Sequence, residues 1–167
     1  AVRFRWSDLG SEWDVFGVDP DVTREQVNEV LRLLPRMWAE GPFEWHSKTF
    51  SMPRRDVTPK PVTRPHPRLW VTAGSPESFE AAGRMGVGVL GTVMLSPMEH
   101  LEMLSQAHQR GLAACQPIGE VVNRELSVLA FMHCAETEQQ AIESHAAEAV
   151  IWFMNAQAEV FGVAPEV

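Results

Sequence analysis

From residue 69 onward, short apolar runs alternate with helical patterns, and this alternation limits the possible folds more than any other feature. The apolar runs are typical of buried strands and lie at 69–74, 87–94 and 126–135. Each is followed by a helical pattern, at 75–86, 96–111 and 136–162. Strands that alternate with helices form α/β units around a parallel sheet with right-handed crossovers. We therefore expect an α/β fold.

The residues before this region add one more strand and helix. Residues 2–6 alternate apolar and basic side chains, which predicts a short strand and brings the expected number of strands to about four. A helix is expected within 19–40, with Thr23 and Gln26 as a capping box and a kink at Pro35. The apolar face of this helix consists of Val27, Val30, Leu31, Leu34 and Trp38.

An excursion separates this helix from the regular alternation and covers about 41–67. The aromatic residues of 43–53 predict a hairpin or an irregular strand pair, in which His46 is solvated. Prolines then recur between 53 and 67 and exclude a helix or a central strand there. We expect this second part to be extended.

Composition excludes several classes of protein. The 167 residues include 14 Lys and Arg against 22 Asp and Glu, a net charge of −8. Nucleic acids and anionic membranes are bound by clustered cations, so neither is an expected partner. The chain does have a local basic cluster among its prolines, which we expect to be a solvated loop: Arg54, Arg55, Lys60, Arg64 and Arg68. No apolar run is long enough to span a bilayer.

The cysteines and histidines give no sign of a metal centre. Cys115 and Cys134 are spaced for neither a disulfide scaffold nor a zinc site, so we expect free, buried thiols in the cytoplasm. His133 and Cys134 are adjacent at a strand end, where they point to opposite faces, and we expect a structural role. Three further histidines lie on expected helices at unrelated spacings: His100, His108 and His145.

The turn after the apolar run 69–74 is a candidate ligand site. Ser75 suits the N-cap of a helix, and Pro76 suits the first helical position. In a parallel sheet, ligands gather at the carboxyl ends of the strands, where this turn lies. The amides that would point out of the helix start are those of Glu77, Ser78 and Phe79.

Two interpretations of this turn are open from the local residues. The hydroxyls of Ser75 and Ser78, together with free amides and the positive helix end, would suit a phosphate, and Gly74 would let it approach the backbone. Helix capping alone explains the same residues, and Glu77 opposes an anion unless its side chain turns away.

Two longer stretches carry a family resemblance. "EWDVFGVDPDVTREQVNEVLRLLPRMW" and "VTPKPVTRPHPRLWVTAGSPESFEAAGRMGVGVL" resemble the bacterial luciferase-like family of flavin-dependent monooxygenases, by the order and spacing of their motifs. The resemblance covers nearly the whole chain and is densest over 57–91. It implies a (β/α)₈ TIM barrel, of which 1–167 would be a single partial domain with about strands 4 to 7.

The resemblance also implies a cofactor site. The family holds the flavin phosphate on a Ser-containing turn, which Ser75 and Ser78 match, with Ala73 and Gly74 beside them. Arg5 is the nearest match to an arginine that joins this site, although Trp6 competes for the position. The wall of the flavin ring would consist of Leu90, Gly91 and Thr92.

The implied activity is that of a flavin-dependent monooxygenase which uses reduced FMN and O₂ on a small organic substrate. A separate flavin reductase and a homo-oligomer are possible partners under this resemblance, and a deazaflavin is the alternative cofactor. A family barrel needs roughly twice this length, so we expect the chain to be part of a larger protein. The alternative from another class is a non-catalytic flavin- or phosphate-binding barrel fragment or assembly subunit.

Overall fold

The computed structural model describes residues 2–4, 15–93 and 97–161. The chain divides into two compact units, one made of residues 1–6 and 21–129 and the other of residues 7–20 and 130–167. The first unit contains the sheet and three helices, and the second contains the C-terminal helices. The prediction of a single domain over 1–167 stays a prediction.

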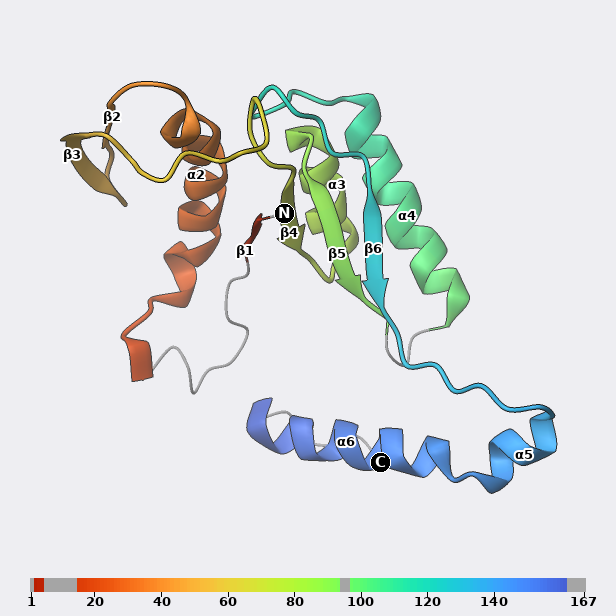
Figure 1. Cartoon of the computed structure of the whole chain (residues 1–167). Helices are drawn as coiled ribbons and strands as arrows, with labels where there is room; N and C mark the ends of the chain where they lie inside the picture. The colour runs from red at the N-terminus through yellow and green to blue at the C-terminus, as the bar shows by residue number, and fades with distance from the viewer. Residues whose placement is uncertain (1, 5–14, 94–96, 162–167) are drawn as a thin grey trace. The chain divides into compact units, whose positions relative to one another are not determined.

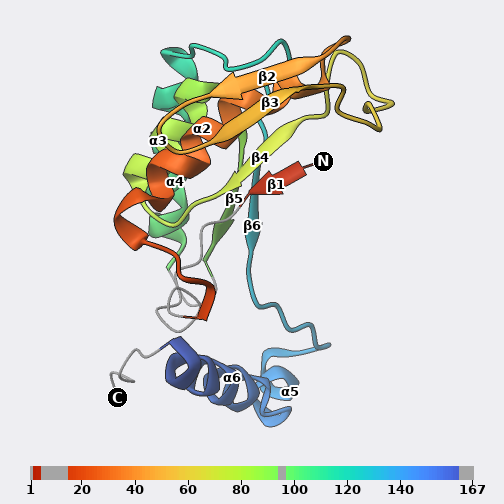
Figure 2. The ribbon, with the colours of Figure 1, turned by 90° about the vertical axis from the view of Figure 1, so that its left-hand side faces the viewer.

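The first unit is built on a four-stranded parallel sheet. Its strands are β1 (Val2–Phe4), β4 (Leu69–Thr72), β5 (Gly88–Thr92) and β6 (Leu126–Leu129), in the order β1-β4-β5-β6. Three helices lie on one side of it, α2 (Pro20–Trp38), α3 (Pro76–Met85) and α4 (Met98–Ala113), as Figures 1 and 2 show. The predicted α/β fold with a parallel sheet is confirmed.

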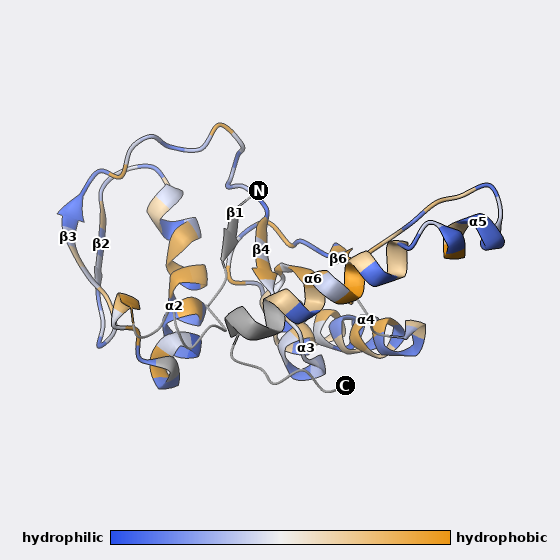
Figure 3. Cartoon of the chain, turned by 90° about the horizontal axis from the view of Figure 1, so that it is seen from below, coloured by the Kyte–Doolittle hydropathy of each residue, from blue (hydrophilic) through white to orange (hydrophobic). Residues whose placement is uncertain are grey.

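The hydrophobic core lies between the sheet and the helices. The predicted apolar face of α2 is confirmed, because Leu31 and Leu34 are buried while Val27, Val30 and Trp38 pack against the core. Alternate residues of β4 and β5, among them Val71 and Val89, point to the same core. Figure 3 shows the result as a strongly hydrophobic β4, in contrast to the hydrophilic β3.

Helices α3 and α4 approach each other very closely. A side chain at Gly83 would collide with the backbone of His108 and Leu112, and one at Gly111 would collide with the backbone of Glu80. Glycine is therefore required at both positions, since backbone cannot move aside as a flexible side chain can. At the exposed edge of this contact, Arg110 of α4 pairs with Glu80 of α3, which also pairs with Arg84 on its own helix.

The hairpin of the excursion packs on α2. It consists of β2 (Phe43–His46) and β3 (Ser51–Arg55), which pair antiparallel as predicted. The Trp45 indole nitrogen donates a hydrogen bond of 2.6 Å to the Glu29 carboxylate, and the Arg36 guanidinium lies 5.5 Å from the centre of the Trp45 ring. Figures 1 and 2 show that α2 lies between this hairpin and the sheet.

The proline-rich part of the excursion forms no helix and no central strand, as predicted, but it bends at 58–59 and 62–65 and is not uniformly extended. One member of its basic cluster has a structural role. The Lys60 ammonium donates to the backbone carbonyls of Met37, Ala39 and Gly41 at 3.2, 2.6 and 3.3 Å. A cation at this position satisfies carbonyls that the end of α2 leaves without helical partners. Lys60 is half-buried with its ammonium group bound to these carbonyls, whereas the four arginines of the cluster are exposed.

Two buried polar side chains hold the amino ends of the strands together. His66 is 2% exposed, and its Nδ1 lies 2.9 Å from the Pro67 carbonyl while its Nε2 accepts from the Val121 amide. Asn123 is 1% exposed; its amide group donates to the Leu69 carbonyl at 3.0 Å, and its side-chain oxygen accepts from the Glu125 amide. Both residues therefore join the loop before β6 to the start of β4.

Several boundaries differ from the prediction. Helix α2 begins at Pro20, so Thr23 lies inside the helix and cannot be its cap. Pro35 lies inside α2 as expected, the helix ends at Trp38, and the kink at Pro35 stays a prediction. Strand β6 ends at Leu129, well before the predicted end at residue 135.

On α4, Leu104 and His108 are buried, whereas Met98 is 74% exposed. The cysteines differ in part from the prediction. Both cysteines are free, as expected, yet neither is buried: Cys115 is half-buried and Cys134 is exposed.

The second unit contains two helices where one long helix was predicted. These are α5 (Glu138–Glu143) and α6 (Ala146–Phe161), and the break falls at His145, whose φ of 57° is incompatible with a continuous helix. Within this unit Phe131 and Phe153 meet edge to face, with ring centres 5.7 Å apart. No helix in the described ranges is long and apolar enough to cross a membrane.

The glycine contact predicts a loss of stability. Gly111→Ala would place a methyl group against the Glu80 carbonyl, so we expect the free energy of unfolding to fall by about 1–3 kcal/mol, as overpacking does elsewhere. Urea denaturation measures this. Gly74→Ala is the matched control, because no atom lies within 4 Å of its new methyl group, and we expect a change within about 0.5 kcal/mol. Equal losses in both variants would contradict the packing explanation.

His108 predicts a pH dependence. The residue is fully buried, neither ring nitrogen has a hydrogen-bond partner of normal geometry, and burial lowers its pKa, which a backbone interaction with Val87 opposes only in part. The unfolded chain then binds the proton more readily than the folded one, so the free energy of unfolding should fall as the pH drops through about 6.5.

His108→Leu should reduce the loss of unfolding free energy at acidic pH, as measured by urea denaturation between pH 5 and 8. Leu112→Met, at a buried position on the same helix, is the control: it changes packing without removing a titratable group, so it should retain the acid sensitivity of the parent protein. The same pH profile in His108→Leu and the parent would refute the assignment.

Candidate functional site

The candidate site is the turn between β4 and α3. Ser75 is the N-cap of α3, with an extended backbone, and Pro76 takes the first helical position. The hydroxyl oxygens of Ser75 and Ser78 lie 3.2 Å apart on one rim of the helix start. Ser-Pro suits a helix start here for two reasons. The Ser75 hydroxyl oxygen accepts a hydrogen bond from an amide that has no partner within the helix, and Pro76 has no backbone N–H that would need one.

The amides of this turn are less available than the sequence indicated. The Ser78 amide donates to the Ser75 hydroxyl oxygen at 3.3 Å, and the Phe79 amide donates to the Ser75 carbonyl at 3.0 Å. The Glu77 amide is in hydrogen-bond contact with its own carboxylate. The expectation of three outward-pointing free amides is therefore wrong, because the cap and the first helical turn engage them.

Glu77 takes the position that an external anion would need. Its pKa lies below the usual range, first because its own backbone amide and then because the Ser75 hydroxyl hydrogen bonds the carboxylate, and Arg24 adds a further electrostatic contribution. The side chain is fully exposed. A bound phosphate would therefore have to displace this carboxylate from the helix start.

Arg24 is a site candidate that sequence reasoning missed. It lies near the start of α2, and its charge acts on Glu77 at the start of α3. The sequence could have indicated it, because Arg24 lies in the first turns of a helix that follows a strand. Helices that follow the strands of a parallel sheet begin at its carboxyl edge, where the turn also lies. Arg5, the arginine carried over from the family resemblance, lies outside the described residues.

The remaining predicted residues flank this turn. Ala73 is buried and its amide donates to the Leu90 carbonyl at 3.2 Å, which ties the end of β4 to β5. Gly74 is exposed, with open space where a side chain would be. Leu90 and Thr92 point to one face of β5, whereas Gly91 points to the other, against the Phe79 ring.

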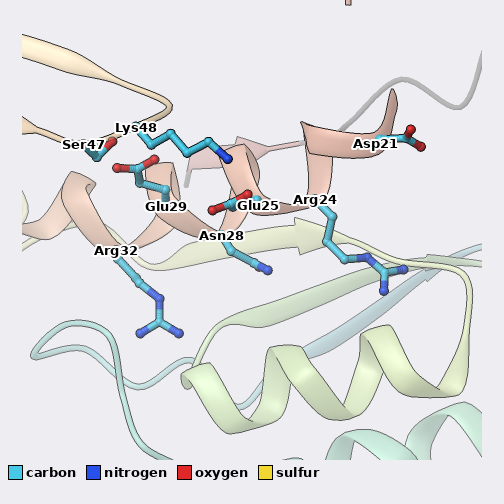
Figure 4. Close-up of a pocket in the computed structure, with 8 residues that line it drawn as sticks. All are labelled: Asp21, Arg24, Glu25, Asn28, Glu29, Arg32, Ser47 and Lys48. Carbon is cyan, nitrogen blue, oxygen red and sulfur yellow. The ribbon is translucent and has the colours of Figure 1, made fainter. Parts of the chain in front are cut away.

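An open pocket of about 560 Å³ lies along α2 and the hairpin turn in the first unit, and its lining includes Arg24, whose charge also acts on Glu77. Figure 4 shows Lys48, Glu25 and Glu29 on the hairpin side of α2, and Arg24, Asn28 and Arg32 on its other side. The lining also includes Asp21 and Ser47. Its three cations and three carboxylates balance, so the pocket offers a phosphate no net positive charge.

No other cluster of side chains forms a catalytic arrangement in the described ranges. His133 Nε2 lies 2.9 Å from the Ser144 hydroxyl, but that hydroxyl donates to the Ala141 carbonyl and the pair is exposed. Cys134 takes no part in it. The same residues contain no group of three or more acidic, His or Cys side chains that could hold a metal ion.

The chain is similar to a known protein family and to two curated proteins. The model of the luciferase-like monooxygenase family matches residues 8–165. The oxygenase component of a flavin-dependent trigonelline monooxygenase from Acinetobacter baylyi is 26% identical over 125 residues, which cover 75% of this chain and 34% of that protein. An uncharacterised protein, y4wF from Sinorhizobium fredii, is 28% identical over 81 residues, which cover 48% of this chain and 24% of that protein.

Two solved structures with a similar fold are those of monooxygenases. RslO1 from Streptomyces bottropensis has a TM-score of 0.71 and 27% identity and covers 96% of this chain. The oxygenating constituent of a 3,6-diketocamphane monooxygenase from Pseudomonas putida, solved with FMN, has a TM-score of 0.65 at 16% identity over 91% of this chain. The chain spans 48% and 46% of these two proteins, and about a third of the trigonelline relative.

Glu77 generates a testable prediction about anions. Glu77→Gln removes the charge that competes for the helix start, so we expect tighter binding of inorganic phosphate, measured by isothermal titration calorimetry. Because the pKa of Glu77 is lowered, its carboxylate is ionised throughout the neutral pH range, so protonation of this group should not improve phosphate binding to the parent protein there. Glu99→Gln, at the start of α4, is the matched control. Unchanged phosphate affinity in Glu77→Gln would argue against anion binding at this turn.

Proposed function

Since this chain belongs to the luciferase-like monooxygenase family, we propose that the protein is a flavin-dependent monooxygenase that holds FMN by its phosphate at the Ser75–Ser78 turn. The observation that carries the proposal is the pair of hydroxyls 3.2 Å apart at a helix start on the carboxyl edge of the sheet. Hydroxyls and a helix start are suited to a phosphate. We infer that the chain forms about strands 4 to 7 of a (β/α)₈ barrel.

The residues at this edge fit such a cofactor on three counts. Gly74 leaves open space for a phosphate to approach the backbone. Arg24 supplies positive charge that partly offsets Glu77. Leu90 and Thr92 offer an apolar side chain and a hydroxyl on the same face of β5, next to the end of β4, where a ring attached to the phosphate would lie.

The chain's own residues would bind and orient the cofactor. Ser75 and Ser78 would donate their hydroxyl hydrogens to phosphate oxygens, and Leu90 would exclude water from one face of the ring. When bound, reduced flavin supplies the electrons and the reaction with O₂ by which a small organic substrate is oxygenated. Orientation and shielding are what the protein adds to that chemistry.

The proposed partners follow from the relatives. The trigonelline relative is an oxygenase component, so we propose that a separate flavin reductase provides the reduced cofactor here as well. We also propose a homo-oligomer in the cytoplasm, where free thiols such as Cys115 and Cys134 remain reduced.

The test is the removal of both hydroxyls. Ser75→Ala combined with Ser78→Ala should weaken FMN binding by about 2–4 kcal/mol, taking about 1–2 kcal/mol for each lost phosphate contact. Quenching of flavin fluorescence in the full-length protein measures the affinity. Riboflavin, which lacks the phosphate, is the control ligand, and its affinity should not change.

Ser78→Ala alone separates binding from folding, because Ser75 is the cap of α3 and Ser78 is not. It should weaken FMN binding with little change in the thermal midpoint. The proposal fails if the double variant binds FMN as tightly as the parent protein, or if riboflavin and FMN lose affinity equally.

A further inference from the structure

The side of the sheet opposite the helices carries its own set of side chains. Val71, Val89 and Val128 point towards the core under the helices, so their neighbours along each strand point the other way. Gly91 confirms the direction for β5, because a side chain there would meet the Phe79 ring of α3. The opposite face of β4, β5 and β6 therefore presents Trp70, Thr72, Leu90, Thr92, Ser127 and Leu129.

The strand register places these side chains in rows. Thr72 of β4 pairs with Leu90 of β5, and Leu90 pairs in turn with Ser127 of β6. Thr92 pairs with Leu129 in the next row towards the carboxyl edge. Neighbouring strands lie about 4.8 Å apart, so the Leu90 side chain lies directly between two hydroxyls.

This surface is continuous with the turn that follows β4. Ala73, Gly74 and Ser75 come directly after Thr72, and the Ala73 amide is bonded to the Leu90 carbonyl. In the described part of the chain Ser127 and Thr92 are exposed, and Leu129 is 58% exposed. A ligand anchored at Ser75 can thus extend across Leu90 towards Ser127.

We propose that Ser127 is a specificity-determining residue of the flavin site, where its hydroxyl hydrogen bonds the polar edge of the ring that lies over Leu90. The inference rests on the proposed function and deepens it. An isoalloxazine ring has one edge of carbonyls and ring nitrogens and one edge of methyl groups. Leu90 and Leu129 match its apolar parts, and the Ser127 hydroxyl, which can both donate and accept, matches its polar edge.

The first test is Ser127→Ala in the full-length protein. We expect FMN affinity to fall about 3- to 10-fold, as the loss of one hydrogen bond produces, and the visible absorption maximum of bound FMN to shift. Ser127→Thr retains a hydroxyl and should restore both properties. Ser105→Ala on α4 is the matched control, since it removes a serine hydroxyl from an outer helix, and should change neither.

The outcomes separate this inference from the proposed function. Unchanged FMN affinity and absorption in Ser127→Ala, while the Ser75 and Ser78 double variant still weakens FMN binding, would overturn the role of Ser127 alone. A parent protein that binds no FMN would overturn both. A shift in the unfolding midpoint of Ser127→Ala without any change in bound FMN would show that other parts of the protein cover this face, and would also overturn the inference.

Discussion

The close contact between α3 and α4 fixes the geometry on which the rest of the first unit depends. Gly83 and Gly111 allow the two backbones to meet, and Phe79 of α3 lies fully buried against Gly91 of β5. Because α3 begins directly at the turn after β4, its fixed position against the sheet also fixes Ser75. The position of the candidate turn is therefore set by packing between α3, α4 and the helix-covered face of the sheet.

The two edges of the sheet differ in chemistry. At the amino edge, His66 and Asn123 are buried and use their polar groups on backbone partners, so this edge has little polar capacity left for a ligand. At the carboxyl edge, the side chains of Ser75 and Ser78 are half-buried and hold their hydroxyls near the surface. This division is typical of α/β barrels, in which the amino face contributes stability and the carboxyl face contributes chemistry.

Much of the fold could be predicted from the sequence, and the failures have physical causes. The parallel strands, the hairpin and the apolar face of α2 follow from local periodicity and were confirmed. The helix break at His145 was missed because a single residue with positive φ leaves no trace in the apolar pattern. The residues "PHPR" are part of the stretch that resembles the family, but they did not indicate what His66 does. In the structure, the buried His66 ring accepts a hydrogen bond from the Val121 amide, 55 residues away in sequence.

The sequence by itself determined the local elements and the Ser-Pro turn, because apolar spacing and capping chemistry act over a few residues. Only the tertiary structure decided what the turn faces. Arg24 comes to it from a different helix, and Ser127 is brought into line with Leu90 by strand register. Register and helix packing join residues far apart in the chain, so no local pattern could reveal which hydroxyls share a face.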